Sequence, residues 1–134
     1  MRQINSICIV DDDPITVFGI KKILNNVVEC SNVKSYGNGK LAIDAIKEAL
    51  TKEENLPDII FLDINMPIMD GWQFLEEFTQ LAIDQKLRVN IITSSIDLAD
   101  VKRWEHYRTN SQHLITYNNK PIKKEKMAEI TKVA

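Results

Sequence analysis

The 134-residue chain has few of the features that mark secreted, membrane-bound or nucleic-acid-binding proteins. Its two cysteines, Cys8 and Cys30, form no CxxC pair, so we expect buried free thiols in a reducing compartment, and no disulfide or metal site there. No apolar run is long enough to span a membrane, and the run near the N-terminus is interrupted by three aspartates, which argues against a signal peptide. We expect a cytoplasmic protein that does not contact the membrane.

Neither positive nor negative charge is in large excess. The formal net charge is -2, and lysine and arginine form no block, whereas phosphate backbones are bound by clustered positive charge. We therefore expect no direct contact with nucleic acid. The composition is 44% hydrophobic and 27% charged, with no internal repeat and no low-complexity linker. A chain of this length forms a single core, so we expect one domain over residues 1–134.

Strand-like and helix-like segments alternate along the chain. Short apolar runs between turns predict strands, and apolar residues at helical spacing predict helices. Asp13 before Pro14, and Asp70 before Gly71, are typical of helix N-caps. The expected strands cover residues 4–10, 33–36, 58–62, 89–93 and 113–117, and the expected helices cover residues 14–26, 39–50, 72–84, 97–106 and 122–132. Parallel strands need crossover helices, so this alternation predicts a doubly wound α/β fold with five helices on both faces of a five-stranded parallel sheet.

The stretch from Ile59 to Gly71 says most about function. It begins with four bulky apolar residues after Pro57-Asp58 and ends in a turn with proline and glycine, which predicts a strand buried on both faces. A single carboxylate, Asp63, ends the apolar run. Reacting groups in open α/β sheets collect at the carboxyl ends of the strands, so we expect Asp63 to have a function.

Other polar residues end the neighbouring strands at the same edge of the sheet, namely Asp11, Asp12, Thr93 and Lys120. Three carboxylates at one place repel one another unless a cation is present, and hard oxygen ligands suit Mg²⁺. Lys120 can pair with a phosphoryl oxygen as a point charge, and the Thr93 hydroxyl can donate to another oxygen. Asp63 would then be a nucleophile that forms an aspartyl phosphate.

With these residues the chain resembles a response-regulator receiver domain of two-component signalling, of the stand-alone type. The resemblance covers almost the whole chain and implies the flavodoxin-like strand order 2-1-3-4-5, with no output domain after the receiver. The matching motifs, each at a strand end, are Ile9-Val10-Asp11-Asp12-Asp13, Leu62-Asp63-Ile64-Asn65-Met66-Pro67 to Asp70-Gly71, Thr93-Ser94 and Lys120-Pro121.

The resemblance also implies a role for each site residue. Asp63 is the phosphoacceptor, which takes a phosphoryl group from a histidine kinase or histidine phosphotransfer protein. Asp12 is a direct Mg²⁺ ligand, and Asp11 is a ligand through water. Asp63 and the backbone carbonyl of Asn65 complete the metal site. Such a domain is not a classical enzyme, although self-phosphorylation from small donors and slow autodephosphorylation are expected.

The resemblance further implies a switch. The Thr93 hydroxyl moves toward the phosphoryl group, and Tyr117 turns inward behind it. The surface near the fourth helix, fifth strand and fifth helix then changes, so a downstream protein target is possible. Tyr117 is equally well explained as a core residue. The segment between Thr93 and Lys120 is longer than is usual in the family, which predicts a reshaped fourth helix or exit loop.

Three other classes of function compete with this interpretation. A haloacid-dehalogenase-like phosphotransferase or phosphatase also uses an aspartate after a buried strand, but it needs a second aspartate two residues later, where this chain has Asn65. A flavodoxin-like FMN carrier would need phosphate donors after the first strand, where three aspartates repel a phosphate. A domain of this fold that only mediates contacts would normally have lost one of the acids or the lysine. His106 and His113 are expected to be surface or structural residues.

Overall fold

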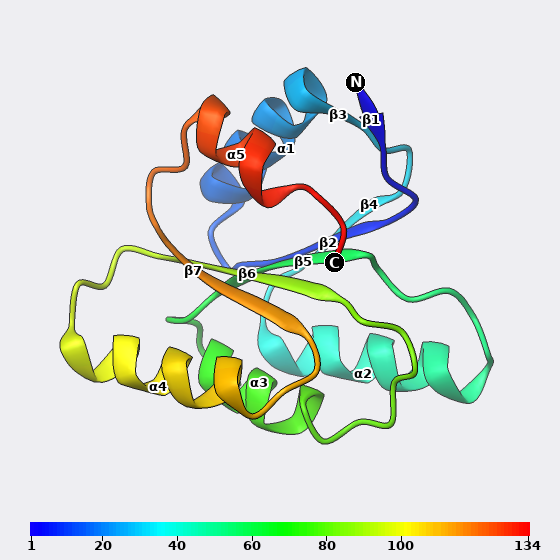
Figure 1. Cartoon of the computed structure of the whole chain (residues 1–134), viewed down its shortest axis with the longest axis vertical. Coiled ribbons are helices and arrows are strands. Elements are labelled where there is room, and N and C mark those ends of the chain that lie inside the picture. The colour runs from blue at the N-terminus through cyan, green and yellow to red at the C-terminus, as the bar shows by residue number, and fades with distance from the viewer.

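The computed structural model describes residues 1–134 and contains a five-stranded parallel sheet between two layers of helices (Figure 1). In spatial order the strands are β4 (Val33–Tyr36), β2 (Ile7–Val10), β5 (Ile59–Asp63), β6 (Arg88–Thr93) and β7 (Leu114–Asn119). Counted along the chain, these five strands have the order 2-1-3-4-5. The predicted doubly wound α/β fold is therefore confirmed.

The helices divide between the two faces of the sheet. One face is covered by α1 (Pro14–Val27) and α5 (Lys124–Ile130), and the other by α2 (Gly39–Thr51), α3 (Gly71–Phe78) and α4 (Leu98–Thr109) (Figure 1). No helix combines the length and the apolar character that a bilayer crossing requires.

The two predicted helix caps are present. Asp13 Oδ1 accepts a hydrogen bond from the backbone N–H of Ile15 at 3.0 Å, and Pro14 occupies the first helical position of α1. Asp70 and Gln73 form a capping box, in which each side chain accepts from the other's backbone N–H at 2.8 and 2.9 Å. These bonds satisfy amide groups that have no partner inside the helix, and so they fix where α1 and α3 begin.

The central strand β5 is apolar on both of its faces because it separates two cores. Ile59 and Phe61 pack into the core beneath α1 and α5, whereas Ile60 and Leu62 pack into the core beneath α2 and α3. All four residues are almost completely buried. A strand fixed from both sides holds Asp63, its last residue, in a defined place.

The first predicted strand is too long at its start. Residues 4–6 lie outside the main sheet, because the preceding β1 (Arg2–Gln3) pairs with β3 (Val28–Glu29) in a separate two-stranded parallel sheet. The backbone N–H of Ile4 continues this pairing and donates to Glu29 O at 2.9 Å. The small sheet was not predicted, since two-residue strands have no hydrophobic period.

Helix α3 ends at Phe78, so its predicted extension to Asp84 is wrong. The Thr79 hydroxyl bonds back to Leu75 O at 2.8 Å, and the next residues form turns that bring Ile83 into the core at 3% exposure. Burial of Ile83 therefore decides where the helix stops. The other predicted ends differ by a few residues: α4 continues past residue 106 to Thr109, β7 covers residues 114–119, and α5 covers only residues 124–130.

Both cysteines are free, but they differ in burial. Cys8 is buried in β2, and burial raises the pKa of its thiol to about 12. Cys30 is half-buried, so the prediction of two buried thiols is wrong for Cys30.

His113 is a structural residue, as expected. Its Nδ1 accepts a hydrogen bond from the backbone N–H of Leu87 at 2.9 Å, and its ring lies 4.9 Å from that of Phe78. Burial, together with the nearby charge of Lys86, lowers the pKa of His113. Its neutral form is therefore the form that stabilises the fold.

We expect this histidine to make unfolding dependent on pH. In the unfolded chain it protonates near pH 6.5, whereas the folded protein keeps it neutral to lower pH. Its contribution to stability is thus complete above pH 6.5 and is lost as the pH falls. In urea unfolding at pH 7.5, 6.5 and 5.5, the free energy of unfolding should fall more steeply with decreasing pH in the wild type than in His113→Asn. The difference between the two slopes should be at most about 1.4 kcal/mol per pH unit.

The asparagine can still accept from Leu87 N–H, so it removes the titration without removing the acceptor. His106→Asn, at an exposed position on α4, is the matched control. Its free energy of unfolding should depend on pH as steeply as that of the wild type. Equal slopes for the wild type and His113→Asn would contradict this assignment.

Candidate functional site

The predicted site residues lie at one edge of the sheet, where the parallel strands end. Asp63 is the last residue of β5, Asp11 follows β2, and Lys120 follows β7. Thr93, the last residue of β6, is one position beyond Ile92, which pairs with Asp63 in the strand register. The backbone N–H of Lys120 donates to Thr93 O at 2.8 Å.

Three carboxylates converge at this edge. Asp11, Asp12 and Asp63 can each offer an oxygen, and these oxygens lie within 4.8 Å of one another. Asp11 and Asp63 are buried, whereas Asp12 is exposed to solvent. Backbone amides fix the two buried side chains: Asp11 Oδ1 accepts from Asp13 N at 2.9 Å, and Asp63 Oδ1 accepts from Ile64 N at 3.0 Å.

Lys120 lies between the two buried acids. Its Nζ is 3.3 Å from Asp11 Oδ2 and 3.4 Å from Asp63 Oδ1. A single ammonium group is thus paired with two of the three carboxylates. The same position lets the ammonium contact a group attached to Asp63.

The charges at this edge shift one another's pKa values. Burial, and then the charge of Asp11, raise the pKa of Asp63, while Lys120 opposes this rise. Burial lowers the pKa of Lys120, but the carboxylates of Asp63 and Asp11 outweigh this effect and hold its pKa above the usual value. Lys120 is therefore charged at neutral pH, and the excess negative charge favours a further cation.

The switch candidates lie beside this cluster and share a partner. Thr93 is completely buried, and its Oγ1 accepts from the backbone N–H of Ser95 at 3.0 Å. The hydroxyl of Tyr117, which is half-buried, donates to Ser95 O at 3.3 Å, and Asn119 Nδ2 donates to the same oxygen at 2.8 Å. The Tyr117 ring packs against Trp104 with a centroid distance of 5.8 Å.

Sequence reasoning missed Ser95 and Asn119. Ser95 follows the strand-end Thr93 by two positions, so its place next to the site could have been noticed. Nothing in the sequence indicates that the side chain of Asn119 reaches across to Ser95.

The loop from β5 to α3 folds closely against Asp63. Gly71 N donates to Ile64 O at 2.9 Å, and a Cβ at Gly71 would lie 2.5 Å from Asp63 O. Asn65 is exposed in this loop. Ile68, also exposed, has a φ of 72°, which is a strained backbone conformation for a β-branched residue.

A sequence model of the family described as "response regulator receiver domain" matches residues 7–132. The chain belongs to this family.

Individual receiver proteins resemble the chain over most of its length. It is 30% identical over 129 residues to an uncharacterized response regulatory protein of Vibrio cholerae, a match that covers 96% of this chain and 44% of that protein. A two-component response regulator from Cytophaga hutchinsonii has a crystal structure with a TM-score of 0.81 and 28% identity, covering 96% of this chain and 95% of that one. The CheX–CheY–BeF₃–Mg²⁺ complex from Borrelia burgdorferi gives a TM-score of 0.69 and 25% identity, covering 94% and 84% of the two chains.

The chain spans less than half the length of the Vibrio protein. It spans a quarter or less of several other curated relatives, which are protein-glutamate methylesterases. The similarity to these proteins therefore describes their shared receiver domain, and their other activities are not carried over to this chain.

The acidic residues of this receiver domain fit a divalent metal ion. Receiver domains bind Mg²⁺ at an acidic pocket. Asp11, Asp12 and Asp63 supply three hard oxygen ligands within 4.8 Å, and one lysine does not neutralise them. This donor set is the type that Mg²⁺ prefers.

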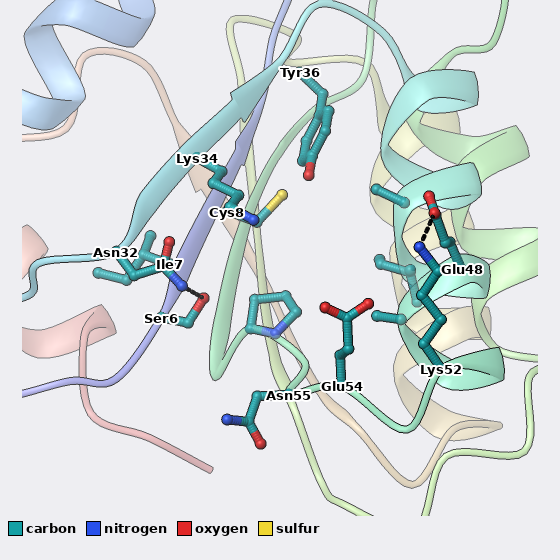
Figure 2. A pocket seen from close by; sticks show the side chains of 14 residues that line it. Ser6, Ile7, Cys8, Asn32, Lys34, Tyr36, Glu48, Lys52, Glu54 and Asn55 are labelled. Carbon is teal, nitrogen blue, oxygen red and sulfur yellow. Dashed lines mark hydrogen bonds and ion pairs between the residues drawn. The ribbon is translucent and has the colours of Figure 1, made fainter.

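The receiver domain also has a pocket that is separate from the acidic site. This pocket of about 330 Å³ lies between α2 and the edge of the sheet, where Cys8 and Tyr36 face Glu48 and Lys52 (Figure 2). Lys52 Nζ is paired with Glu48 Oε1 at 2.6 Å. The high pKa of Cys8 keeps its thiol protonated at neutral pH, so this thiol is not an activated nucleophile.

Proposed function

We propose that this receiver domain accepts a phosphoryl group on Asp63 from a phosphohistidine of a histidine kinase or histidine phosphotransfer protein. The observation that carries the proposal is the position of Asp63, which ends a buried strand within reach of two other carboxylates and 3.4 Å from Lys120 Nζ. A cation held by the carboxylates, together with the Lys120 ammonium, would neutralise the charge of an anionic phosphoryl group while Asp63 acts as the nucleophile.

In the proposed transfer, an oxygen of the Asp63 carboxylate bonds to phosphorus while the P–N bond of the donor breaks. The donor imidazole keeps the electron pair of that bond. Asp11, Asp12, Asp63 and the Asn65 backbone carbonyl would hold Mg²⁺, which when bound neutralises charge on the transferring group. Lys120 then pairs with a phosphoryl oxygen in place of the Asp63 oxygen that it contacts in the resting protein.

The same event would operate the switch. The Thr93 hydroxyl turns toward a phosphoryl oxygen and donates to it, and the Tyr117 ring moves inward behind it. The face formed by α4, β7 and α5 then changes shape for a protein partner. Phosphorylation can shift this equilibrium only by the interactions that it gains in one of the two states.

Asn65 bears on the competing phosphatase function. A haloacid-dehalogenase-like enzyme needs an acid two residues after the nucleophile, and the amide of Asn65 cannot donate a proton to a leaving group. The receiver function therefore fits this chain better.

The proposal is tested by exposing the purified protein to acetyl phosphate with and without Mg²⁺ and measuring intact mass. We expect one added phosphoryl group with Mg²⁺ and almost none after EDTA, because the carboxylates repel the donor without the metal. Asp44→Asn, which changes an exposed acid on α2, should behave as the wild type.

No mass gain with acetyl phosphate or with a phosphorylated histidine phosphotransfer protein would refute the phosphoacceptor function. Steady release of phosphate from organic phosphate esters would support the phosphatase class instead.

A further inference from the structure

Ser95 connects the acidic site to α4. Its backbone N–H donates to Thr93 Oγ1 at 3.0 Å, and its carbonyl accepts from Tyr117 and Asn119. Its hydroxyl donates to Asp100 Oδ2 at 2.6 Å. The backbone N–H, the carbonyl and the hydroxyl of Ser95 are therefore all engaged in hydrogen bonds, which connect Thr93 to Asp100.

Asp100 also forms a hydrogen bond with a residue of α3. It lies in the first turn of α4, where a carboxylate is favoured by the helix dipole. Its second oxygen, Oδ1, accepts from Trp72 Nε1 at 3.1 Å. Trp72 follows Gly71, the residue packed against the Asp63 carbonyl, and it is buried. The carboxylate of Asp100, itself a residue of α4, thus connects the loop after Thr93 to α3.

Helix α4 is attached to the domain through partly buried side chains. None of its residues is fully buried, but Trp104 and Tyr107 pack against the core beneath α2 and α3. Trp104 Nε1 donates to Ile115 O at 2.9 Å, and the Tyr107 hydroxyl donates to Glu76 Oε2 at 2.8 Å. The Tyr107 ring stacks on Trp72 with a centroid distance of 6.0 Å and an interplanar angle of 14°. A helix held by such bonds and by partly buried rings is displaced at a lower cost in free energy than one with a fully buried apolar face.

We propose that Asp100 is a positioning residue that transmits the state of Thr93 to the interface between α3 and α4. This inference rests on the proposed phosphorylation of Asp63. When the Thr93 hydroxyl turns to the phosphoryl group, the Ser95 N–H loses its acceptor and the Ser95 hydroxyl moves away from Asp100. The Asp100 carboxylate then releases the Trp72 indole, and the first turn of α4 shifts with it.

The coupling must act in both directions. If the bonds of Asp100 stabilise the resting state, they oppose the phosphorylated state by the same free energy. Removing them should therefore tighten binding of beryllium fluoride, a phosphoryl mimic, in the presence of Mg²⁺. The expected change is about fivefold, which corresponds to one hydrogen bond of ordinary strength. A residue that only stabilised the fold would not tighten binding.

The test follows the two indole N–H signals by ¹H–¹⁵N NMR in the wild type, Asp100→Ala and Ser95→Ala. The chain has two tryptophans, so Trp72→Phe assigns the signals. In the wild type, beryllium fluoride with Mg²⁺ should move the Trp72 signal. In both variants the Trp72 signal without beryllium fluoride should already lie closer to its position in the beryllium fluoride complex of the wild type. Adding beryllium fluoride should then shift the signal by less than half of the wild-type shift. Ser94→Ala changes the exposed neighbour and is the matched control.

Three results would overturn the inference. If the Trp72 signal of Asp100→Ala and Ser95→Ala responds as in Ser94→Ala, and beryllium fluoride binds no tighter, Asp100 does not transmit the state of Thr93. If intact mass shows no phosphoryl uptake by the wild type, the proposed function fails and this inference fails with it. Uptake without a Trp72 response overturns only the inference.

Discussion

Replacing Lys120 with methionine is expected to slow phosphoryl uptake on Asp63 by about 10²-fold, the usual effect of removing one charge-stabilising group from a transition state. Lys120 Nζ lies 3.3 and 3.4 Å from the two buried acids and is the only cationic group of the protein paired with either. Methionine keeps the apolar stem but loses the charge. The rate is measured from the increase of phosphorylated mass with time in acetyl phosphate and Mg²⁺.

The same variant should bind Mg²⁺ more tightly than the wild type. Lys120 competes with a metal ion for Asp11 and Asp63, so its removal leaves these carboxylates free. Slower transfer together with tighter metal binding distinguishes a functional lysine from general damage to the site. Lys124→Met, at an exposed position of α5, should change neither quantity. A Lys120→Met protein that is phosphorylated as fast as Lys124→Met would contradict the proposed role.

Replacing Gly71 with alanine is expected to destabilise the fold by about 3 kcal/mol, at the upper end of the effect of overpacking. The new Cβ would lie 2.5 Å from Asp63 O and 2.9 Å from Ile64 Cα. Both contacts are with backbone atoms, which cannot rotate away as a side chain does. The start of α3 or the end of β5 must therefore move, and with it the phosphoacceptor. Urea unfolding measures the loss of stability.

Gly19→Ala is the matched control for this effect. Gly19 lies inside α1, and a Cβ there meets no atom within 4 Å. Alanine is the better helix former, so this variant should gain about 0.5–1 kcal/mol. A Gly71→Ala protein as stable as the wild type would show that the loop after Asp63 can move without strain.

The main sheet could be predicted because its central strands, β2 and β5, are apolar on both faces and because clear helix signals separate the strands. The run from Ile59 to Leu62 packs into two cores, so its pattern has no polar interruption until Asp63. The helix starts at Asp13 and Asp70 were equally predictable, since a cap is a local interaction.

The errors arose where tertiary contacts override local pattern. Helix α3 stops early because Ile83 is buried, although residues 79–84 could continue a helix. The small sheet of β1 and β3 exists because the two segments meet in space, not because either resembles a strand.

The candidate site was predicted from one rule, that the strand ends of a parallel sheet meet at one edge. That rule places Asp11, Asp63 and Lys120 together, and the structure gives their contacts. It cannot supply the link from Thr93 through Ser95 to Asp100, because this link depends on side-chain rotamers and on the docking of α4. The longer segment before Lys120 forms a regular α4 and a six-residue β7, and its effect on the output surface stays a prediction.

The central claim is that Asp63 itself carries the phosphoryl group, and borohydride reduction tests it directly. The reagent reduces an acyl phosphate to an alcohol, so a phosphorylated aspartate becomes homoserine, which peptide mass mapping locates. After treatment with acetyl phosphate and Mg²⁺, we expect conversion at Asp63 alone, and none in Asp63→Asn. Conversion at Asp11 or Asp12, or at none of the three acids, would contradict the account.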